Sequence, residues 1–132
     1  LPFGLNIIHQ KDSQGANSIA KNFSVSRSVI AGGDFNNPKS SEKNIEVFTF
    51  HNGRLLFPPI QTPPHGYRSV LSFITDESLF CCGLTGVDIS TDGGLNWKLI
   101  SDESFHVCAK AKKGNAVFLA GKDGRIAKLV KE

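Results

Sequence analysis

The sequence predicts an all-β chain, and two observations support this prediction. Short runs rich in Val, Ile, Leu and Phe, such as "SLFCCG", "NAVFLAG" and "RIAKLV", alternate with Gly, Asn and Asp. The chain also resembles itself. Residues 66–86 align with residues 104–124 without a gap, and residues 15–33 align with the start of the same segment. No stretch carries a sustained helical stripe, so we expect two to three copies of one strand-rich unit.

Each copy is expected to be a four-stranded antiparallel meander. In the first copy, "NIEVFTF" is the third strand and "RLLFP" the fourth, with Asn-Gly between them as a tight turn. "GVDIS" and "NWKLI" fill the same places in the second copy. In the third copy "RIAKLVKE" is a third strand and no fourth follows. Such units, repeated at roughly 40 to 50 residues, are typical of β-propeller blades. The predicted fold is therefore a partial β-propeller of two to three four-stranded blades.

The 132 residues are expected to form a single partial propeller. Its blades span approximately residues 15–60, 66–102 and 104–132, and residues 1–14 are the tail of a preceding blade. A ring needs about four to eight blades. The chain contains no methionine, so Leu1 is not a translation start. We therefore expect the C-terminal portion of a longer propeller, or a subunit whose ends a partner covers.

Composition argues against several classes of function. The net charge is +3 without a long basic run, so we expect no nucleic-acid partner. No apolar run approaches the roughly 20 residues that span a bilayer. Cys81, Cys82 and Cys108 are odd in number and suit buried free thiols better than disulfides. No residue spacing suggests a metal site, and no motif suggests a cofactor.

One motif stands between two predicted strands. Ser90, Asp92, Gly94 and Trp97 are spaced as S-x-D-x-G-x-x-W. The Asp92 carboxylate can accept hydrogen bonds from turn amides, Gly94 can adopt a positive φ, and Trp97 can pack under the turn. We interpret the motif as a structural element of a hairpin and not as a binding site.

This motif resembles the Asp-box of BNR (bacterial neuraminidase) repeats, S-x-D-x-G-x-T-W, with Asn96 in place of the threonine. Through "IAGGDF", "GYRS" and "GVDISTDGG", residues 15–129 are similar to BNR-repeat propellers labelled oxidoreductases. They are also similar to photosystem II stability and assembly factor propellers. The resemblance implies the fold, places the box between the outer two strands of a blade, and favours the cell envelope, the periplasm or secretion. It is a poor guide to activity, because propellers host many functions.

Sialidases share the Asp-box, but their chemistry needs an arginine cluster, a tyrosine nucleophile and acidic partners. The sole tyrosine, Tyr67, precedes Arg68. Neighbouring side chains on a strand point to opposite faces, so these two cannot converge. We assign no catalytic residue.

A propeller binds ligands where the loops that lead into its first strands meet the loops between its second and third strands. The candidate binding residues are those at the aligned positions before the first strand of each copy, called lead-in positions, and in the loop between its second and third strands. They are Asn17, Tyr67, Arg68, His106, Asp34, Lys122 and Asp123. Arg68 and His106 either solvate the mouth of the channel or bind an anionic or carbonyl group. Tyr67 and Phe105 are expected to pack between blades.

Two functions remain open. The preferred one is a noncatalytic interaction scaffold whose partner is a protein or the remaining blades of its own propeller. The alternative is a carbohydrate-binding protein, or a glycosidase-like or oxidoreductase-labelled enzyme, with its site at the channel mouth. For this chain alone we favour the noncatalytic function.

Overall fold

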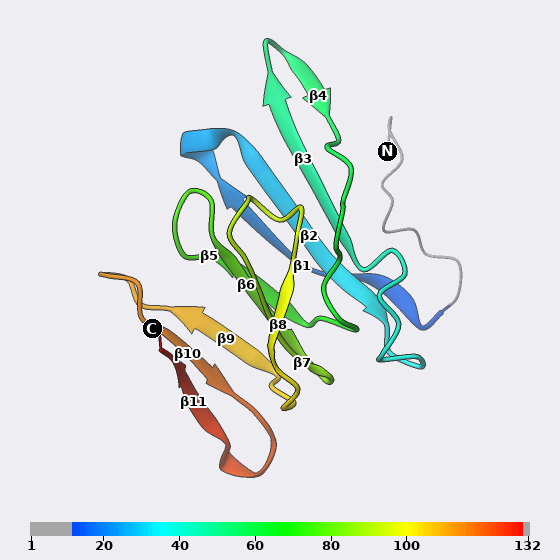
Figure 1. Cartoon of the computed structure of the whole chain (residues 1–132), viewed down its shortest axis with the longest axis vertical. Coiled ribbons are helices and arrows are strands. Elements are labelled where there is room, and N and C mark those ends of the chain that lie inside the picture. The colour runs from blue at the N-terminus through cyan, green and yellow to red at the C-terminus, as the bar shows by residue number, and fades with distance from the viewer. Residues whose placement is uncertain (1–11, 131–132) are drawn as a thin grey trace.

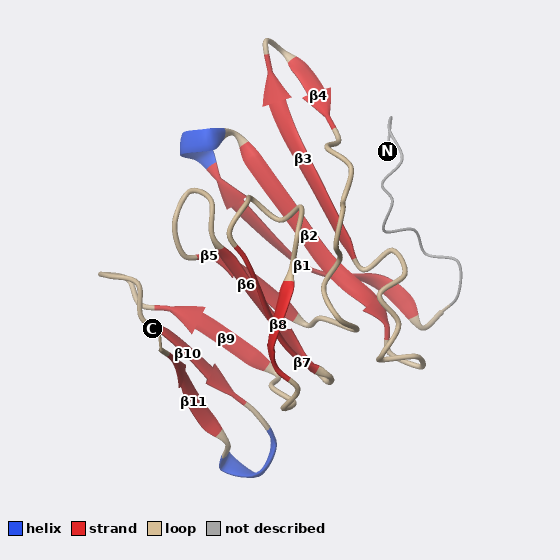
Figure 2. Cartoon of the chain, in the orientation of Figure 1, coloured by secondary structure: helices blue, strands red, loops and turns tan. Residues whose placement is uncertain are grey.

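A computed structural model describes residues 12–130 and shows an all-β chain of eleven strands in three antiparallel sheets (Figures 1 and 2). The first sheet contains β1 (Gln14–Asn22), β2 (Arg27–Asp34), β3 (Ile45–His51) and β4 (Arg54–Leu56). The second contains β5 (Val70–Phe73), β6 (Leu79–Gly83), β7 (Gly86–Ser90) and β8 (Lys98–Ser101). The third contains β9 (Val107–Lys110), β10 (Val117–Ala120) and β11 (Ile126–Leu129). Two short 3₁₀ turns, η1 (Phe23–Val25) and η2 (Lys122–Gly124), are the helical elements of the described residues.

Each sheet is a meander in which spatial order follows chain order. The expected third and fourth strands of the first two units are present as β3, β4, β7 and β8. Asn52 and Gly53 join β3 to β4 with φ angles of 51° and 75°. Both central residues of the preferred two-residue hairpin turn need a positive φ, which Asn and Gly adopt most readily. Residues 1–11 of the predicted preceding blade lie outside the described residues, and Gln14 already begins β1.

The three sheets stack face to face. One apolar cluster joins Val29 and Val47 of the first sheet to Leu79 and Cys81 of the second. Another joins Phe80 and Cys82 of the second sheet to the third. Successive side chains of β6 therefore point to opposite neighbours, as the pleat of a strand requires. Because both faces of this strand are covered, "LFCC" is an unbroken apolar run and does not alternate with polar residues.

The three cysteines are free and buried, as expected for structural thiols. Burial raises the pKa of Cys81. Hydrogen bonding between Cys82 and Cys108, across the junction of the second and third sheets, lowers the pKa of Cys82 and raises that of Cys108.

The first strands of the three sheets lie side by side, β1 against β5 and β5 against β9. Backbone hydrogen bonds join successive sheets at this edge. The Arg68 N–H donates to the Gly32 carbonyl at 2.9 Å, and the Phe105 N–H donates to the Gly83 carbonyl at 3.1 Å. A Cβ atom at Gly83 would collide with the Tyr67 carbonyl, so this close approach requires glycine.

Candidate functional site

A buried ion pair stands at the start of the second sheet. Arg68 lies just before β5, Asp88 lies in β7, and both side chains are 0% exposed. Asp88 Oδ2 accepts from Arg68 Nη2 at 2.6 Å and from Nε at 3.0 Å. The guanidinium also donates to the carbonyls of His65 and Tyr67 and to Thr85 Oγ1, at 3.0–3.1 Å. All three guanidinium nitrogens thus have acceptors, which is what a buried charge needs to offset its desolvation.

Asp88 also holds His65. The imidazole Nδ1 lies 2.6 Å from Asp88 Oδ1, and the His65 backbone N–H donates to Oδ2 at 2.9 Å. The His65 side chain is 46% exposed. One carboxylate therefore bridges an interior cation and a surface imidazole. Occupying Nδ1 orients the ring and leaves Nε2 as the nitrogen that could meet a partner.

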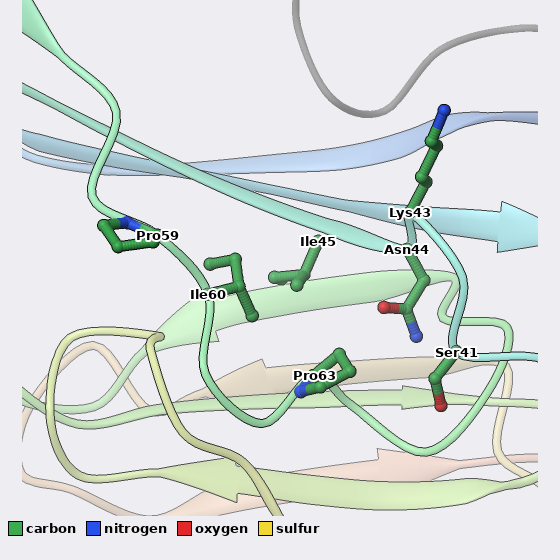
Figure 3. Close-up of a pocket in the computed structure, with 7 residues that line it drawn as sticks. All are labelled: Ser41, Lys43, Asn44, Ile45, Pro59, Ile60 and Pro63. Carbon is green, nitrogen blue, oxygen red and sulfur yellow. The ribbon is translucent and has the colours of Figure 1, made fainter.

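The segment before Arg68 is fixed from the first sheet. Asn44, which precedes β3, donates from Nδ2 to the carbonyls of Pro64 and Gly66 at 2.9 and 2.7 Å. The long polar loop after β2 also reaches across, and its Pro38 carbonyl accepts from the Tyr67 N–H at 2.8 Å. A pocket of about 350 Å³ lies beside this segment. Figure 3 shows Asn44, Ile45, Ile60 and Pro63 among the residues that line it. Together these hydrogen bonds hold the start of the second sheet against the first sheet.

The structure corrects the alignment of the lead-in positions by one residue. Arg68 and Phe105 occupy the same place, because each donates its backbone N–H to a glycine carbonyl in the second strand of the preceding sheet, Gly32 in β2 and Gly83 in β6. The gapless alignment had paired Arg68 with His106. The shift arises because the connection before β10, residues 111–116, is one residue longer than the connection before β6, residues 74–78. Arg68 is consequently buried, and it does not face solvent as the sequence had suggested.

The other predicted positions divide between this junction and separate turns. Asn17 is exposed, and its side-chain amide donates to the Arg68 carbonyl at 2.9 Å. Tyr67 is half-buried and packs on Gly33. Asp34 is buried and accepts from the Asn36 N–H at 3.0 Å, which closes its own turn. His106, Lys122 and Asp123 are exposed on the third sheet. The structure thus brings Asn17, Tyr67 and Arg68 together.

Sequence reasoning missed His65 and Asp88. The available signal was Asp88 itself, an acid in the centre of the strand "GVDIS". A charge in an otherwise apolar strand indicates a buried partner, because an unpaired carboxylate there is costly. No comparable signal marks His65, which lies in a Pro- and Gly-containing loop.

The turn between β7 and β8 has the expected hydrogen bonds. Asp92 Oδ1 accepts from the backbone amides of Leu95 and Asn96 at 3.2 and 3.0 Å. The Trp97 indole N–H donates to the Gly94 carbonyl at 2.8 Å, and Trp97 is 3% exposed. Partial burial acts to raise the pKa of Asp92. Hydrogen bonds from Asn96, Ser90 and Leu95 outweigh it and hold the pKa below its ordinary value.

Asn96, the departure from the Asp-box pattern, links this turn to the segment before β5. Its Nδ2 donates to Asp92 Oδ2 at 2.8 Å and to Gln61 Oε1 at 3.1 Å, and its Oδ1 accepts from Thr62 Oγ1 at 2.8 Å. Arg27 of the first sheet donates to the Gly93 carbonyl at 2.9 Å. The turn is therefore wedged between sheets, which favours a structural role over a binding role.

Within residues 12–130, no group of three or more His, Cys, Asp or Glu side chains is placed to hold a metal ion. No helix in that range is long and apolar enough to cross a membrane. No protein-family model matches the chain, and no curated protein matches it. The geometry of the sheets and of the Arg68 junction is therefore the basis for a functional proposal.

Proposed function

We propose that the chain supplies three consecutive blades of a BNR-type β-propeller that acts as a noncatalytic interaction scaffold. The observation that carries the proposal is the face-to-face stack of three meanders whose first strands lie side by side. The first strands of propeller blades surround a central channel, and each blade packs on the next through its sheet faces. The Asp92 turn between the third and fourth strands of the second sheet supports the BNR assignment.

The end of the stack where the chain enters the first strand of each sheet, called the lead-in end, has a chemistry that favours a scaffold over an enzyme. Arg68 and Asp88 are both buried and hydrogen-bond to each other, which stabilises the junction. Asn17 in the first sheet and His106, just before the first strand of the third sheet, are exposed at the same end of the stack, where a protein partner can reach them. We place the docking surface for a protein partner at this end. Blades that complete the propeller are the alternative partner.

Site-specific photocrosslinking tests the docking surface. A photoreactive phenylalanine analogue replaces Asn17 or His106 at the lead-in end. It replaces Lys113, exposed in the connection before β10, as the matched control at the opposite end. We expect Asn17 and His106 to yield adducts with the same cellular protein, and Lys113 to yield none. Equal adducts at both ends, or no adducts at all, would contradict the proposal.

One observation favours a second function, a carbohydrate site at the same end. His65 is held by a buried carboxylate and is partly exposed, an arrangement that suits a hydrogen-bonding or general-base role. Glycan-array binding and turnover of nitrophenyl glycosides test this alternative. His65→Gln should abolish any signal, and His51→Gln, on an exposed histidine of β3, should leave it unchanged. The alternative fails if the wild-type protein neither binds nor turns over these probes.

A further inference from the structure

Each sheet has a forward face, turned toward the next sheet in chain order, and a backward face turned the other way. The forward faces of the first and second sheets carry Val29 and Phe80, respectively. The equivalent residue in the third sheet is Phe118, because β10 occupies the place of β2 and β6. Val29 and Phe80 are both 0% exposed, but Phe118 is 48% exposed.

A second position on the forward face repeats this contrast. Ile45, Val87 and Ile126 lie at the start of the third strands, Val87 one residue after the first. They pair with Ala31, Cys82 and Ala120, respectively, so they are equivalent. Ile45 and Val87 are 4% and 3% exposed, but Ile126 is 76% exposed. The positions that are buried at two junctions are thus open on the third sheet.

The backward face of the first sheet is open at one equivalent position, although Ile30 on the same face is buried. Ile19 pairs with Ile30 just as Leu71 pairs with Cys81, so Ile19 and Leu71 are equivalent. Leu71 is buried against the first sheet, whereas Ile19 is 52% exposed. Ser28 stands where Leu79 stands in the second sheet. Beside it is a pocket of about 340 Å³. Its walls include Ile19, Ser28, Phe48 and Phe50.

We propose that a second copy of the chain covers these faces head to tail. The forward face of the third sheet of one copy packs on the backward face of the first sheet of the other. The inference rests on the proposed propeller stacking. Its basis is continuity with the two internal junctions: Val29 shares a cluster with Leu71, and Phe80 shares one with Cys108. The corresponding third pair is Phe118 with Ile19 of the second copy.

The number of sheets fits a closed ring. Two copies of the three sheets in residues 12–130 supply six sheets, within the range of about four to eight that propellers use. A head-to-tail interface closes into a ring when its rotation permits, and propeller stacking supplies such a rotation at every junction. Closure would cover both open faces of both copies.

Sedimentation equilibrium on the 132-residue chain measures the assembly. We expect a species of twice 14.3 kDa. Phe118→Asp should weaken its association at least about tenfold, because a carboxylate would be buried against apolar surface. The matched control is Phe35→Asp, which alters an exposed phenylalanine in the loop after β2 and should leave association unchanged. A monomer at all concentrations overturns the proposal.

Disulfide trapping tests the geometry. Phe118→Cys combined with Ile19→Cys should give a covalent dimer on mild oxidation, because the native cysteines are buried. Neither single variant should form one. A covalent dimer of Phe118→Cys alone indicates head-to-head pairing and overturns the proposal. A monomer that keeps its photoadducts at Asn17 and His106 overturns only the dimer. A trapped dimer without those adducts overturns only the scaffold.

Discussion

The two junctions between sheets share the same backbone hydrogen bond but bury side chains of different chemistry. In each, the residue two positions before the first strand donates its N–H to a glycine carbonyl of the preceding sheet. At the first junction that residue is Arg68, held by Asp88. At the second it is Phe105, which is 2% exposed, packs in an apolar cluster and lies under the Arg125 guanidinium, 5.8 Å from its ring centroid.

Both junctions therefore bury a large side chain at this position, although one side chain is charged and the other is aromatic. What that side chain can be is decided on the third strand of the same sheet. Asp88 pairs with Cys81 in the second sheet, and Ala127 pairs with Leu119 at the equivalent place in the third. An acid there supports an arginine, whereas an alanine leaves space for apolar packing.

The largest loss of stability should come from placing an arginine in the junction between the second and third sheets. Phe105→Arg buries a guanidinium where no Asp88 equivalent exists, and it also removes the aromatic packing. We expect a loss of at least about 3–5 kcal/mol in the free energy of unfolding. Urea unfolding followed by circular dichroism measures it. Adding Ala127→Asp should recover part of the loss, and no recovery would show that the two positions are not equivalent.

Removing the acid from the first junction should rank next. Asp88→Ala strands the Arg68 guanidinium in the interior, at a cost of about 3–5 kcal/mol in the free energy of unfolding. Fluorescence of Trp97, which lies in the cluster between the first two sheets, reports the transition. Arg68→Met combined with Asp88→Leu should be far less destabilising than Asp88→Ala, since apolar pairs replace buried ion pairs well. A double variant as unstable as the single one would refute the pairing argument.

The turn between β7 and β8, which contains Asp92, should contribute less to the free energy of unfolding. Asp92→Ala leaves the Leu95 and Asn96 amides without their acceptor and should cost about 1–3 kcal/mol. Photoadducts at Asn17 and His106 should persist in this variant. Unchanged stability together with lost adducts would make the turn a binding site.

The same carboxylate should give a pH dependence of known sign. The pKa of Asp92 in the folded state lies below the ordinary 3.8. The contribution of the Asp92 carboxylate to the free energy of unfolding is therefore fully present above pH 3.8. It is lost as the pH falls through the pKa that Asp92 has in the folded state. The stability difference between wild type and Asp92→Asn should shrink between pH 7 and about pH 2. A difference independent of pH would contradict this assignment.

The smallest effect should fall on the exposed lead-in residues. His106→Ala should change stability by no more than about 0.5 kcal/mol, because the side chain is exposed. Chemical denaturation measures the free energies of unfolding of His106→Ala and of Phe105→Arg, two separate variants at adjacent positions, and we expect them to differ widely. A large loss at His106 would mean that the corrected register is wrong.

The sequence by itself determined the β class, the order of strands in each sheet and the turn that contains Asp92. These features depend on local properties: apolar runs, Asn-Gly and Asp-Gly turns, and the positive φ angles that Asn and Gly adopt. The burial of the three cysteines also followed from their apolar surroundings.

Only the tertiary structure decided which lead-in residue turns inward. A shift of one residue moves every side chain of a strand to the opposite face. That shift depends on a connection that is one residue longer before β10 than before β6. It exchanges the places of Phe105 and His106. The pairing of Arg68 with Asp88 and His65 likewise joins side chains 20 and 23 residues apart. Such contacts arise from the packing of sheets and loops, which no local pattern specifies.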